Sequence, residues 1–263
     1  MPSADEHSPH TVAPCTPTRR DFIRVTSAAA LSCVALDMRT ASGAQAGGRL
    51  RARPHAPSKR VDSGLIALGL TEKRDAQLYV PSGYYPDRAA TLIVGLHGAT
   101  QDSGFILRIL RDAAEAHGCV LLAPNSRGVT WDMIRDDFGE DELLLDRALD
   151  GCFDRCNIDP ARVVIAGFSD GATAALSLGL INGDLFRRII AFSPGFIVGD
   201  ERNGKPPIFI SHGTRDEMLP IGRTSRPIMF ALTKMGYAVS FHEFEGTHTV
   251  PSEMVAATMD WLK

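Results

Sequence analysis

From Gly64 onward, short runs of apolar and β-branched residues alternate with segments of helical periodicity, and this alternation constrains the fold more than any other feature. Runs such as 91–96 and 163–168 are continuously apolar, as expected of strands buried on both faces of a parallel sheet. Strands joined by helices imply right-handed crossovers. The sequence therefore predicts an α/β fold with a mostly parallel central sheet and helices on both faces. The predicted strands are 65–70, 76–80, 91–96, 120–123, 163–168, 189–192, 208–211 and 239–244, and the predicted helices are 103–117, 142–156, 171–181, 222–235 and 253–262.

The composition excludes several classes of protein. The chain has 263 residues, of which 44% are hydrophobic and 22% charged, and this suits one sizeable domain with an apolar core. The 28 basic and 31 acidic residues give a net charge of −3, without a basic stretch that would attract nucleic acid or an anionic membrane surface. No apolar run reaches the roughly 18–20 residues that span a bilayer. We therefore expect no nucleic-acid partner and no integral membrane span.

The first 46 residues have the three-part pattern of an export signal. Arg19 and Arg20 precede a mild apolar segment, 25–36, and small residues follow up to a small-x-small cleavage site that ends at Ala46. Paired arginines followed by Phe-Ile are similar to a twin-arginine signal, so the export machinery is an expected partner and the location is periplasmic or extracellular. An N-terminal helix of the domain itself, and lipid attachment at Cys33, are the alternatives.

Cleavage after Ala46 would leave residues 47–63, which we expect to be a flexible leader, and residues 64–263, which we expect to be the folded catalytic domain. Three cysteines remain in the mature part, and an odd number makes a poor disulfide framework. Cys152 and Cys156 lie four positions apart on a predicted helix, so they would pair only if the helix ended between them. We favour buried thiols, and a Cys152–Cys156 bridge is the alternative to free ones.

A G-x-S-x-G motif, residues 167–171, lies between a predicted buried strand and a predicted helix. A sharp turn at this position would lift the Ser169 hydroxyl above the carboxyl edge of the sheet, where chemistry is expected in parallel sheets. The two glycines would let neighbouring backbone approach closely. The motif predicts that Ser169 is a nucleophile, and a serine that only caps the helix is the alternative.

A serine hydroxyl needs a base near neutral pH, and the base needs an acid to orient it. His248 lies in the loop beyond the last predicted long strand and has no evident packing duty, whereas His212 lies at the start of a turn and His242 inside a strand. Asp216 follows the preceding strand, so its carboxylate can reach the next loop. We predict His248 as the base and Asp216 as the orienting acid, with a solvated turn as the alternative for Asp216.

Acyl transfer also needs N–H donors for the oxyanion of the tetrahedral intermediate. We assign this role to the backbone amides of Asp170, which follows the nucleophile, and of Ala99, beside Gly98 in the loop after strand 91–96. Thr100 and Gln101 in the same loop are expected to contact substrate.

A long loop, 125–141, is expected to wall the substrate pocket with Trp131, Met133, Ile134 and Phe138. Its acidic run lacks the ligand spacing of a calcium loop, so we expect solvated charges and a helix cap at Asp141 instead of a metal site. The predicted chemistry requires no cofactor and no metal.

Together the motifs resemble those of the α/β-hydrolase superfamily, and most closely its lidless carboxylesterase/phospholipase branch, which also resembles poly(3-hydroxybutyrate) depolymerases and feruloyl esterases. The resemblance rests on segments 96–101, 157–163, 167–171, 212–220 and 246–248 and extends from about residue 77 to the C-terminus. It implies an exported serine hydrolase of small or polymeric carboxylic esters. It also implies the absence of a cap domain, since only residues 193–206 separate two strands where a cap is commonly inserted. A polyester depolymerase, a peptidase on the same fold and a catalytically inactive binding module are the alternatives.

Overall fold

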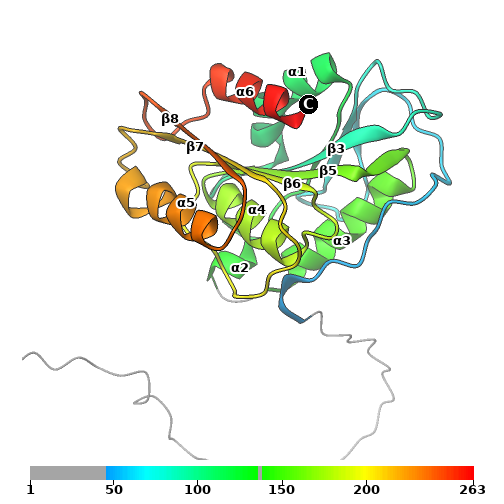
Figure 1. Ribbon diagram of the computed structural model, residues 1–263. Helices are drawn as coiled ribbons and strands as arrows, with labels where there is room; N and C mark the ends of the chain where they lie inside the picture. The colour runs from blue at the N-terminus through cyan, green and yellow to red at the C-terminus, as the bar shows by residue number, and fades with distance from the viewer. Residues whose placement is uncertain (1–45, 136–137) are drawn as a thin grey trace, which may run out of the picture. The chain divides into compact units, whose positions relative to one another are not determined.

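Residues 46–135 and 138–263 are described by a computed structural model of the chain (Figure 1). The paired arginines Arg19 and Arg20, the apolar segment of the predicted export signal and Cys33 lie outside the described residues. Within the described residues, no helix combines the length and the hydropathy that crossing a bilayer requires.

The described residues contain an eight-stranded sheet in the order β1-β2-β4-β3-β5-β6-β7-β8. Strands β1 and β2 are antiparallel to each other, and β2 is antiparallel to β4. Every other neighbouring pair is parallel. The predicted α/β class is therefore confirmed, and the carboxyl ends of β3 to β8 share one edge of the sheet. The strands are β1 (Gly64–Ala67), β2 (Gln77–Val80), β3 (Ala90–Leu96), β4 (Val120–Ala123), β5 (Ile158–Phe168), β6 (Arg188–Phe192), β7 (Ile208–Gly213) and β8 (Val239–Phe244).

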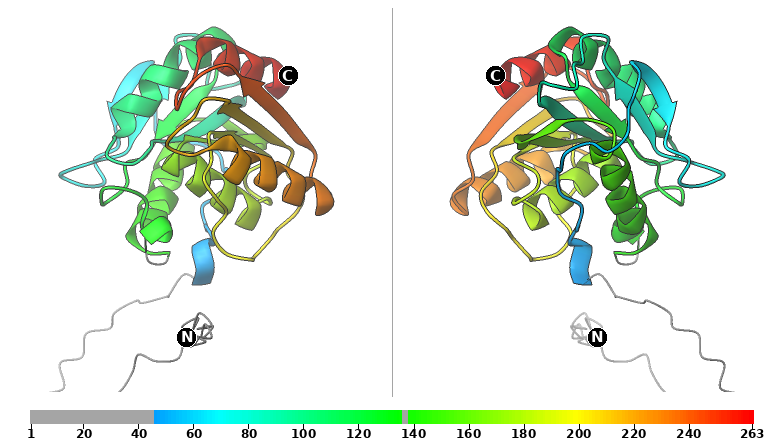
Figure 2. Two further views of the ribbon diagram at one scale, coloured as in Figure 1. Left: turned by 90° about the vertical axis from the view of Figure 1, so that its left-hand side faces the viewer. Right: turned by 90° about the vertical axis from the view of Figure 1, so that its right-hand side faces the viewer.

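Helices cover both faces of the sheet, as Figures 1 and 2 show. Helices α1 (Ser103–His117) and α6 (Ser252–Leu262) lie on one face. On the other face lie α2 (Asp132–Arg135), α3 (Glu140–Phe153), α4 (Asp170–Ile181) and α5 (Ser225–Lys234). Helix α4 is the central one, because every residue from its second to its last is buried. Two short 3₁₀ segments among the described residues are Ala46–Gly48 and Ile221–Arg223.

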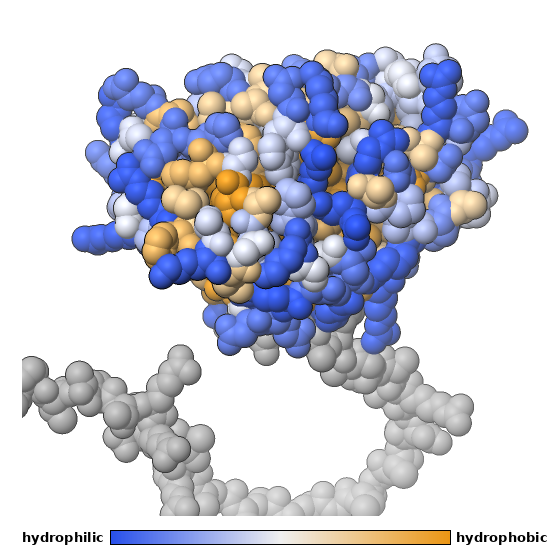
Figure 3. All heavy atoms as spheres, viewed as in Figure 1, coloured by the Kyte–Doolittle hydropathy of each residue, from blue (hydrophilic) through white to orange (hydrophobic). Residues whose placement is uncertain are grey.

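Apolar side chains form one cluster on each side of the sheet. Ile106, Leu110 and Met259 join the cluster under α1 and α6, and Leu149 and Leu176 join the cluster under α3 and α4. Outside, hydrophilic residues predominate on the face drawn in Figure 3, and apolar residues form separate smaller areas there. The sheet is thus buried between two apolar layers, as the continuous apolar strands indicate.

Segment 47–63 differs from the prediction, because it is not a free leader. Leu50 and Ala52 are buried, with 2% and 4% of their surface exposed. The Leu50 amide donates to Asn182 Oδ1 at 2.9 Å, and the Ala52 amide donates to Asp146 Oδ1 at 2.8 Å. Arg49 forms an ion pair with Asp184 at 2.9 Å. The first half of the segment therefore packs onto α3 and the end of α4 through apolar burial and hydrogen bonds.

Two further local predictions are resolved by the structure. Helix α3 begins after Gly139, so Asp141 is not its N-cap but a buried residue of its first turn. Cys152 and Cys156 are buried free thiols although α3 ends at Phe153, between them, and Cys119 is a third buried free thiol.

Candidate active site

The turn between β5 and α4 holds Ser169 in a strained conformation. Its φ and ψ are 57° and −121°, a region that a residue with a Cβ rarely adopts. A Cβ on Gly167 would lie 2.0 Å from the Gly171 carbonyl oxygen, and one on Gly171 would lie 2.2 Å from the Leu96 carbonyl oxygen. Both glycines of the motif are therefore required by close backbone contacts, and the turn presents the serine at the carboxyl edge of the sheet.

The structure brings Ser169, His248 and Asp216 into one hydrogen-bonded chain. His248 Nε2 lies 2.8 Å from Ser169 Oγ, and His248 Nδ1 lies 2.6 Å from Asp216 Oδ2. The order along the chain and the roles of the two ring nitrogens match a nucleophile, a base and an orienting acid. This arrangement can move a proton from the hydroxyl to the imidazole while the carboxylate holds the ring.

Asp216 is held as a carboxylate by hydrogen bonds. It is buried, with 5% of its surface exposed, and its Oδ1 accepts the Met218 and Leu219 amides at 3.0 and 2.8 Å. Burial favours the protonated form, but the hydrogen bonds from Leu219 and His248 outweigh it and lower the pKa of Asp216 below its usual range. A negative charge beside the imidazole is therefore maintained at neutral pH.

His212 is a second histidine on Asp216, and its role was missed from the sequence. The ring is fully buried, with Nε2 3.0 Å from Asp216 Oδ2 and 2.8 Å from the Leu219 carbonyl oxygen. Since Nε2 faces two acceptors, it carries the proton, and Nδ1 accepts the Ser225 hydroxyl at 2.6 Å. Burial lowers the pKa of His212, so it is neutral. The four-residue spacing to Asp216 in a turn was the available signal for this positioning role.

The loop after β3 approaches Ser169 closely. A Cβ on Gly98 would lie 2.9 Å from Gln101 Oε1 and 3.3 Å from Ser169 Cβ, so a glycine is needed there. The Gly98 amide donates to that same Gln101 oxygen at 2.9 Å. Within the described residues, the backbone amides of Ala99 and Asp170 have no protein acceptor. Both N–H groups are therefore available to a substrate oxygen.

His97 holds the base of this loop. Its buried ring donates from Nδ1 to the Gly98 carbonyl oxygen at 2.8 Å, and its Nε2 accepts the Ser126 amide at 3.1 Å. Burial lowers the pKa of His97, so the ring is neutral and each nitrogen has a fixed role. The Arg74 guanidinium donates to the Gln101 carbonyl oxygen at 2.8 Å. The loop is thus anchored by neighbours that lie below the site.

Trp131 was expected to wall the pocket, and this prediction is wrong. Its side chain is buried, with 2% of its surface exposed, and its Nε1 donates to the His97 carbonyl oxygen at 2.9 Å. Met133 is buried as well, at 4% exposed. Trp131 and Met133 therefore point inward, and Trp131 supports the loop after β3 from outside the pocket.

The acidic residues in the first turn of α3 are not all solvated, and this differs from the prediction. Asp141 and Glu142 are 2% and 3% exposed. Asp141 accepts the Arg127 and Asp132 amides at 2.5 and 2.7 Å. The pKa of Asp141 is raised to about 6 and that of Glu142 to about 7, and burial is the main cause of both shifts. Within residues 46–135 and 138–263, no group of three or more histidine, cysteine or acidic residues is arranged to hold a metal ion.

A pocket of about 540 Å³ opens beside Ser169 and His248. Thr100 and Gln101 line it, as expected, together with Ala99. Its apolar wall comes from α1, the end of β5 and the loops that follow β7 and β8. The apolar residues are Phe105, Ile109, Phe168, Met218 and Val250.

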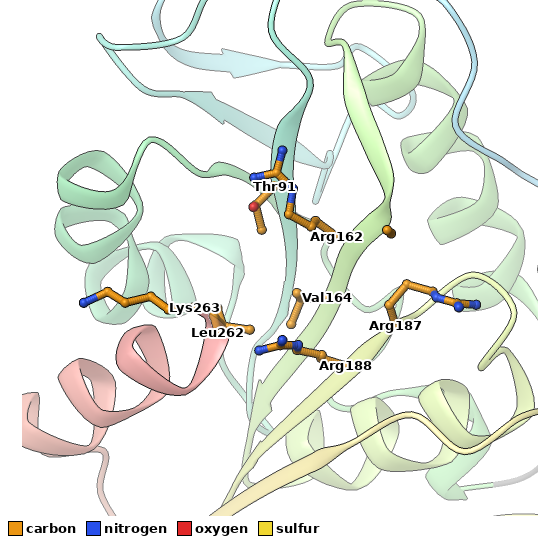
Figure 4. A pocket seen from close by; sticks show the side chains of 8 residues that line it. Thr91, Arg162, Val164, Arg187, Arg188, Leu262 and Lys263 are labelled. Carbon is orange, nitrogen blue, oxygen red and sulfur yellow. The ribbon is translucent and has the colours of Figure 1, made fainter.

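A smaller pocket of about 120 Å³ lies at the opposite, amino ends of the strands (Figure 4). Thr91 of β3, Arg162 of β5 and Arg188 of β6 line it. Arg162 pairs with Asp159 at 2.7 Å, and Arg188 lies over the Trp261 ring. No serine, histidine or carboxylate side chain lines this pocket. The candidate active site is therefore the pocket at the carboxyl edge.

Comparison with known proteins agrees with this placement. The sequence model of the Phospholipase/Carboxylesterase family matches residues 129–263, which are 135 of the 263 residues. The chain belongs to this family of α/β hydrolases. The family resemblance drawn from the motifs is thereby confirmed.

Two curated relatives carry names that bear on chemistry. The chain is 27% identical to feruloyl esterase C of Emericella nidulans over 159 residues, which cover 56% of this chain and 57% of that protein. It is 28% identical to acyl-protein thioesterase 1 of Yarrowia lipolytica over 113 residues, which cover 39% of this chain and 49% of that protein. The chain thus spans about half the length of the curated relatives it matches.

Solved structures of esterases share the fold. The crystal structure of esterase PE8 is 26% identical with a TM-score of 0.59, and the match covers 70% of this chain and 95% of that one. Native esterase 2 of Thermogutta terrifontis is 20% identical with a TM-score of 0.58, and the match covers 82% and 93%. At the lower identity, the likeness carries the fold alone.

Proposed function

We propose that this family member is a serine hydrolase that cleaves carboxylic esters through an acyl-enzyme. The observation that carries the proposal is the hydrogen-bonded chain from Ser169 Oγ through His248 to Asp216, at 2.8 and 2.6 Å, beside an open pocket. Esterase and thioesterase are the words in the relatives' names, and they support an acyl group as the moiety transferred.

In the proposed first step, Ser169 Oγ attacks the carbonyl carbon of the ester while His248 Nε2 takes the hydroxyl proton. Asp216 stabilises the imidazolium that forms. The oxyanion accepts hydrogen bonds from the Ala99 and Asp170 amides, each contributing a few kcal/mol to the transition state. The imidazolium then gives its proton to the leaving oxygen as the bond from that oxygen to the acyl carbon breaks. Water repeats the sequence on the acyl-serine and releases the acid.

Replacing the nucleophile or the base tests this mechanism. Ser169→Ala and His248→Ala should each lower the turnover of p-nitrophenyl acetate by roughly 10⁴-fold or more, because the members of a triad act as a unit. His242→Ala is the matched control. His242 of β8 stacks on Phe209 of β7, and loss of its side chain should leave most of the activity. Activity that survives in His248→Ala and is lost in His242→Ala would contradict the assigned base.

Fluorophosphonate labelling separates an enzyme from an inactive binding module on the same fold. The reagent should modify Ser169 in the wild-type protein and leave Ser169→Ala unlabelled. A folded wild-type protein that stays unlabelled would favour the binding module. The 15 residues 193–207 between β6 and β7 form no helix and leave no room for a cap, which supports an open site for soluble or polymeric esters. A film-clearing assay on a polyester would then separate a depolymerase from an esterase of small substrates, and a peptide substrate would test the peptidase.

We also propose that the protein is exported through its twin-arginine signal, with cleavage after Ala46. Among the described residues, Arg49 is the first that forms an ion pair, and it lies beyond that site, so the mature chain would keep the contacts of Arg49, Leu50 and Ala52 with the domain. Replacing Arg19 and Arg20 with lysines should trap the precursor in the cytoplasm, as measured by fractionation. Unchanged export would refute this part of the proposal.

A further inference from the structure

A second hollow, lined by residues of α1 and α6, adjoins the pocket beside Ser169. This hollow has a volume of about 510 Å³. Ile109 of α1 and Val250, two residues after His248, line both the pocket and the hollow. The two hollows are therefore adjacent, and we call them together the α1–α6 groove.

The floor of the α1–α6 groove is apolar and its outer edge is polar. Val255 and Met259 of α6 are 8% and 3% exposed and belong to the apolar cluster under both helices. Ala113 of α1 packs against the same cluster. Arg108 and Asp112, which are exposed on α1, stand at the edge. An apolar depression with a polar rim is typical of a site that binds a ligand.

Two small side chains, Ala113 of α1 and Ala256 of α6, line the second hollow. Phe105, Ile109 and Ala113 recur every fourth residue along α1, so they share one face of the helix. From Phe105 to His117 this face extends for about 18 Å, at 1.5 Å per residue. The lined face of α1 is therefore elongated, and a linear chain can lie along it.

We propose that the α1–α6 groove binds an extended apolar chain of the substrate, so that the favoured esters carry a long linear hydrocarbon group. This inference rests on the proposed ester hydrolysis at Ser169. The chain can belong to the acyl or to the alcohol half of the ester, because both halves extend from the reacting carbonyl carbon, which lies beside the pocket. The far end of the chain lies between Ala113 and Ala256, where each buried methylene adds about 0.8 kcal/mol of binding, or about fourfold.

Ala256→Trp and Ala113→Trp fill the far end of the groove without touching Ser169, and Ala256 is exposed, so its replacement leaves the core intact. We would measure kcat/KM for p-nitrophenyl esters from acetate to dodecanoate, and for alkyl acetates from ethyl to dodecyl. In one of the two series, the ratio of long-chain to short-chain kcat/KM should fall by about tenfold or more in both variants. The series that responds identifies the half of the ester in the groove.

Ala231→Trp is the matched control, since it makes the same substitution at an exposed position of α5 on the other face of the sheet. It should keep the wild-type chain-length profile. Fluorophosphonate labelling of each variant reports whether its active site is folded. If labelled variants keep the wild-type profile in both series, the groove proposal is overturned while the proposed function stands. If the wild-type protein hydrolyses no ester and is not labelled, the proposed function itself fails.

Discussion

The two sides of Ser169 are built in opposite ways. On the closed side, formed by the described residues of segment 125–139 and the first turn of α3, hydrogen bonds tie the chain to the loop after β3 and to the start of α4. The Thr100 amide donates to the Val129 carbonyl oxygen at 2.7 Å, and the Thr130 hydroxyl donates to Asp170 Oδ2 at 2.5 Å. On the open side, formed by the α1–α6 groove, apolar side chains are left uncovered by the described residues.

This difference divides two tasks that an active site has to combine. Donors for an oxyanion must be fixed before the reaction, and the closed side supplies the packing and hydrogen bonds that fix them. A substrate needs space that is apolar and already formed, and the open side supplies it. An aromatic side chain near the strand ends can therefore serve either task, and only its neighbours decide which.

Removing the buried indole of the closed side should lower the unfolding free energy more than any other substitution considered below. Trp131→Ala deletes a side chain that is 2% exposed, and a cavity of this kind costs about 3–5 kcal/mol of unfolding free energy. It also frees the His97 carbonyl oxygen, so the Ala99 amide loses support and kcat should fall by about tenfold or more. Urea denaturation and p-nitrophenyl acetate turnover measure the two effects.

Two further variants tell whether that effect belongs to the closed side. Trp131→Phe keeps a ring but removes the N–H donor, and it should cost less than Trp131→Ala. Phe105→Ala, on the open side, removes a partly buried ring that stacks on Phe168 at 5.7 Å between centroids. If Phe105→Ala lowered the unfolding free energy as much as Trp131→Ala, the two sides would contribute equally to the stability of the fold.

The hydrogen-bonded arrangement of Ser169, His248 and Asp216 could be predicted from the sequence because local rules fix it. The glycines around Ser169 identify the strained turn, since any Cβ there would meet backbone atoms at about 2 Å. Asp216 and His248 follow β7 and β8, which are parallel neighbours, so their loops must meet at one edge. Strand order and motif chemistry were sufficient to bring these residues together.

Other features could not be found because they depend on distant partners. Trp131 lies in a segment without periodicity, and its inward orientation follows from the acceptor on His97, 34 residues away. Leu50 is fixed by Asn182, which is 132 residues away. The proline and arginine residues of segment 47–63 give no sign of such contacts, so the sequence alone predicts a flexible leader there.

The buried carboxyls of the closed side should make its stability depend on pH. In the folded protein the pKa of Glu142 is raised from 4.5 to about 7, so the folded state holds this proton more tightly than the unfolded state. The corresponding stabilisation is complete below pH 4.5 and is lost as the pH rises through 7. Glu142→Gln keeps a neutral side chain at every pH. It should be more stable than the wild-type protein at pH 8, by up to about 3 kcal/mol, and gain little or nothing at pH 5.

Glu140→Gln is the control for this measurement, because Glu140 is exposed in the same turn of α3. Urea denaturation at the two pH values should show a change of about 0.5 kcal/mol or less for it. Parallel pH profiles for Glu142→Gln and the wild-type protein would mean that burial of Glu142 does not tune the closed side.

The smallest of the expected effects comes from a single tie between segment 125–139 and α4. Thr130→Val keeps the shape of the side chain but leaves Asp170 without its hydroxyl donor, and a lost hydrogen bond to a carboxylate costs about 1–2 kcal/mol. Thr249→Val makes the same change on the open side, at an exposed residue that lines the pocket and whose hydroxyl makes no hydrogen bond within the described residues. Its unfolding free energy should change by about 0.5 kcal/mol or less. The two substitutions are chemically identical, so the difference between their unfolding free energies in urea measures how much the hydrogen bond of the closed side contributes. Equal losses would mean that this hydrogen bond does not make the closed side more stable than the open side.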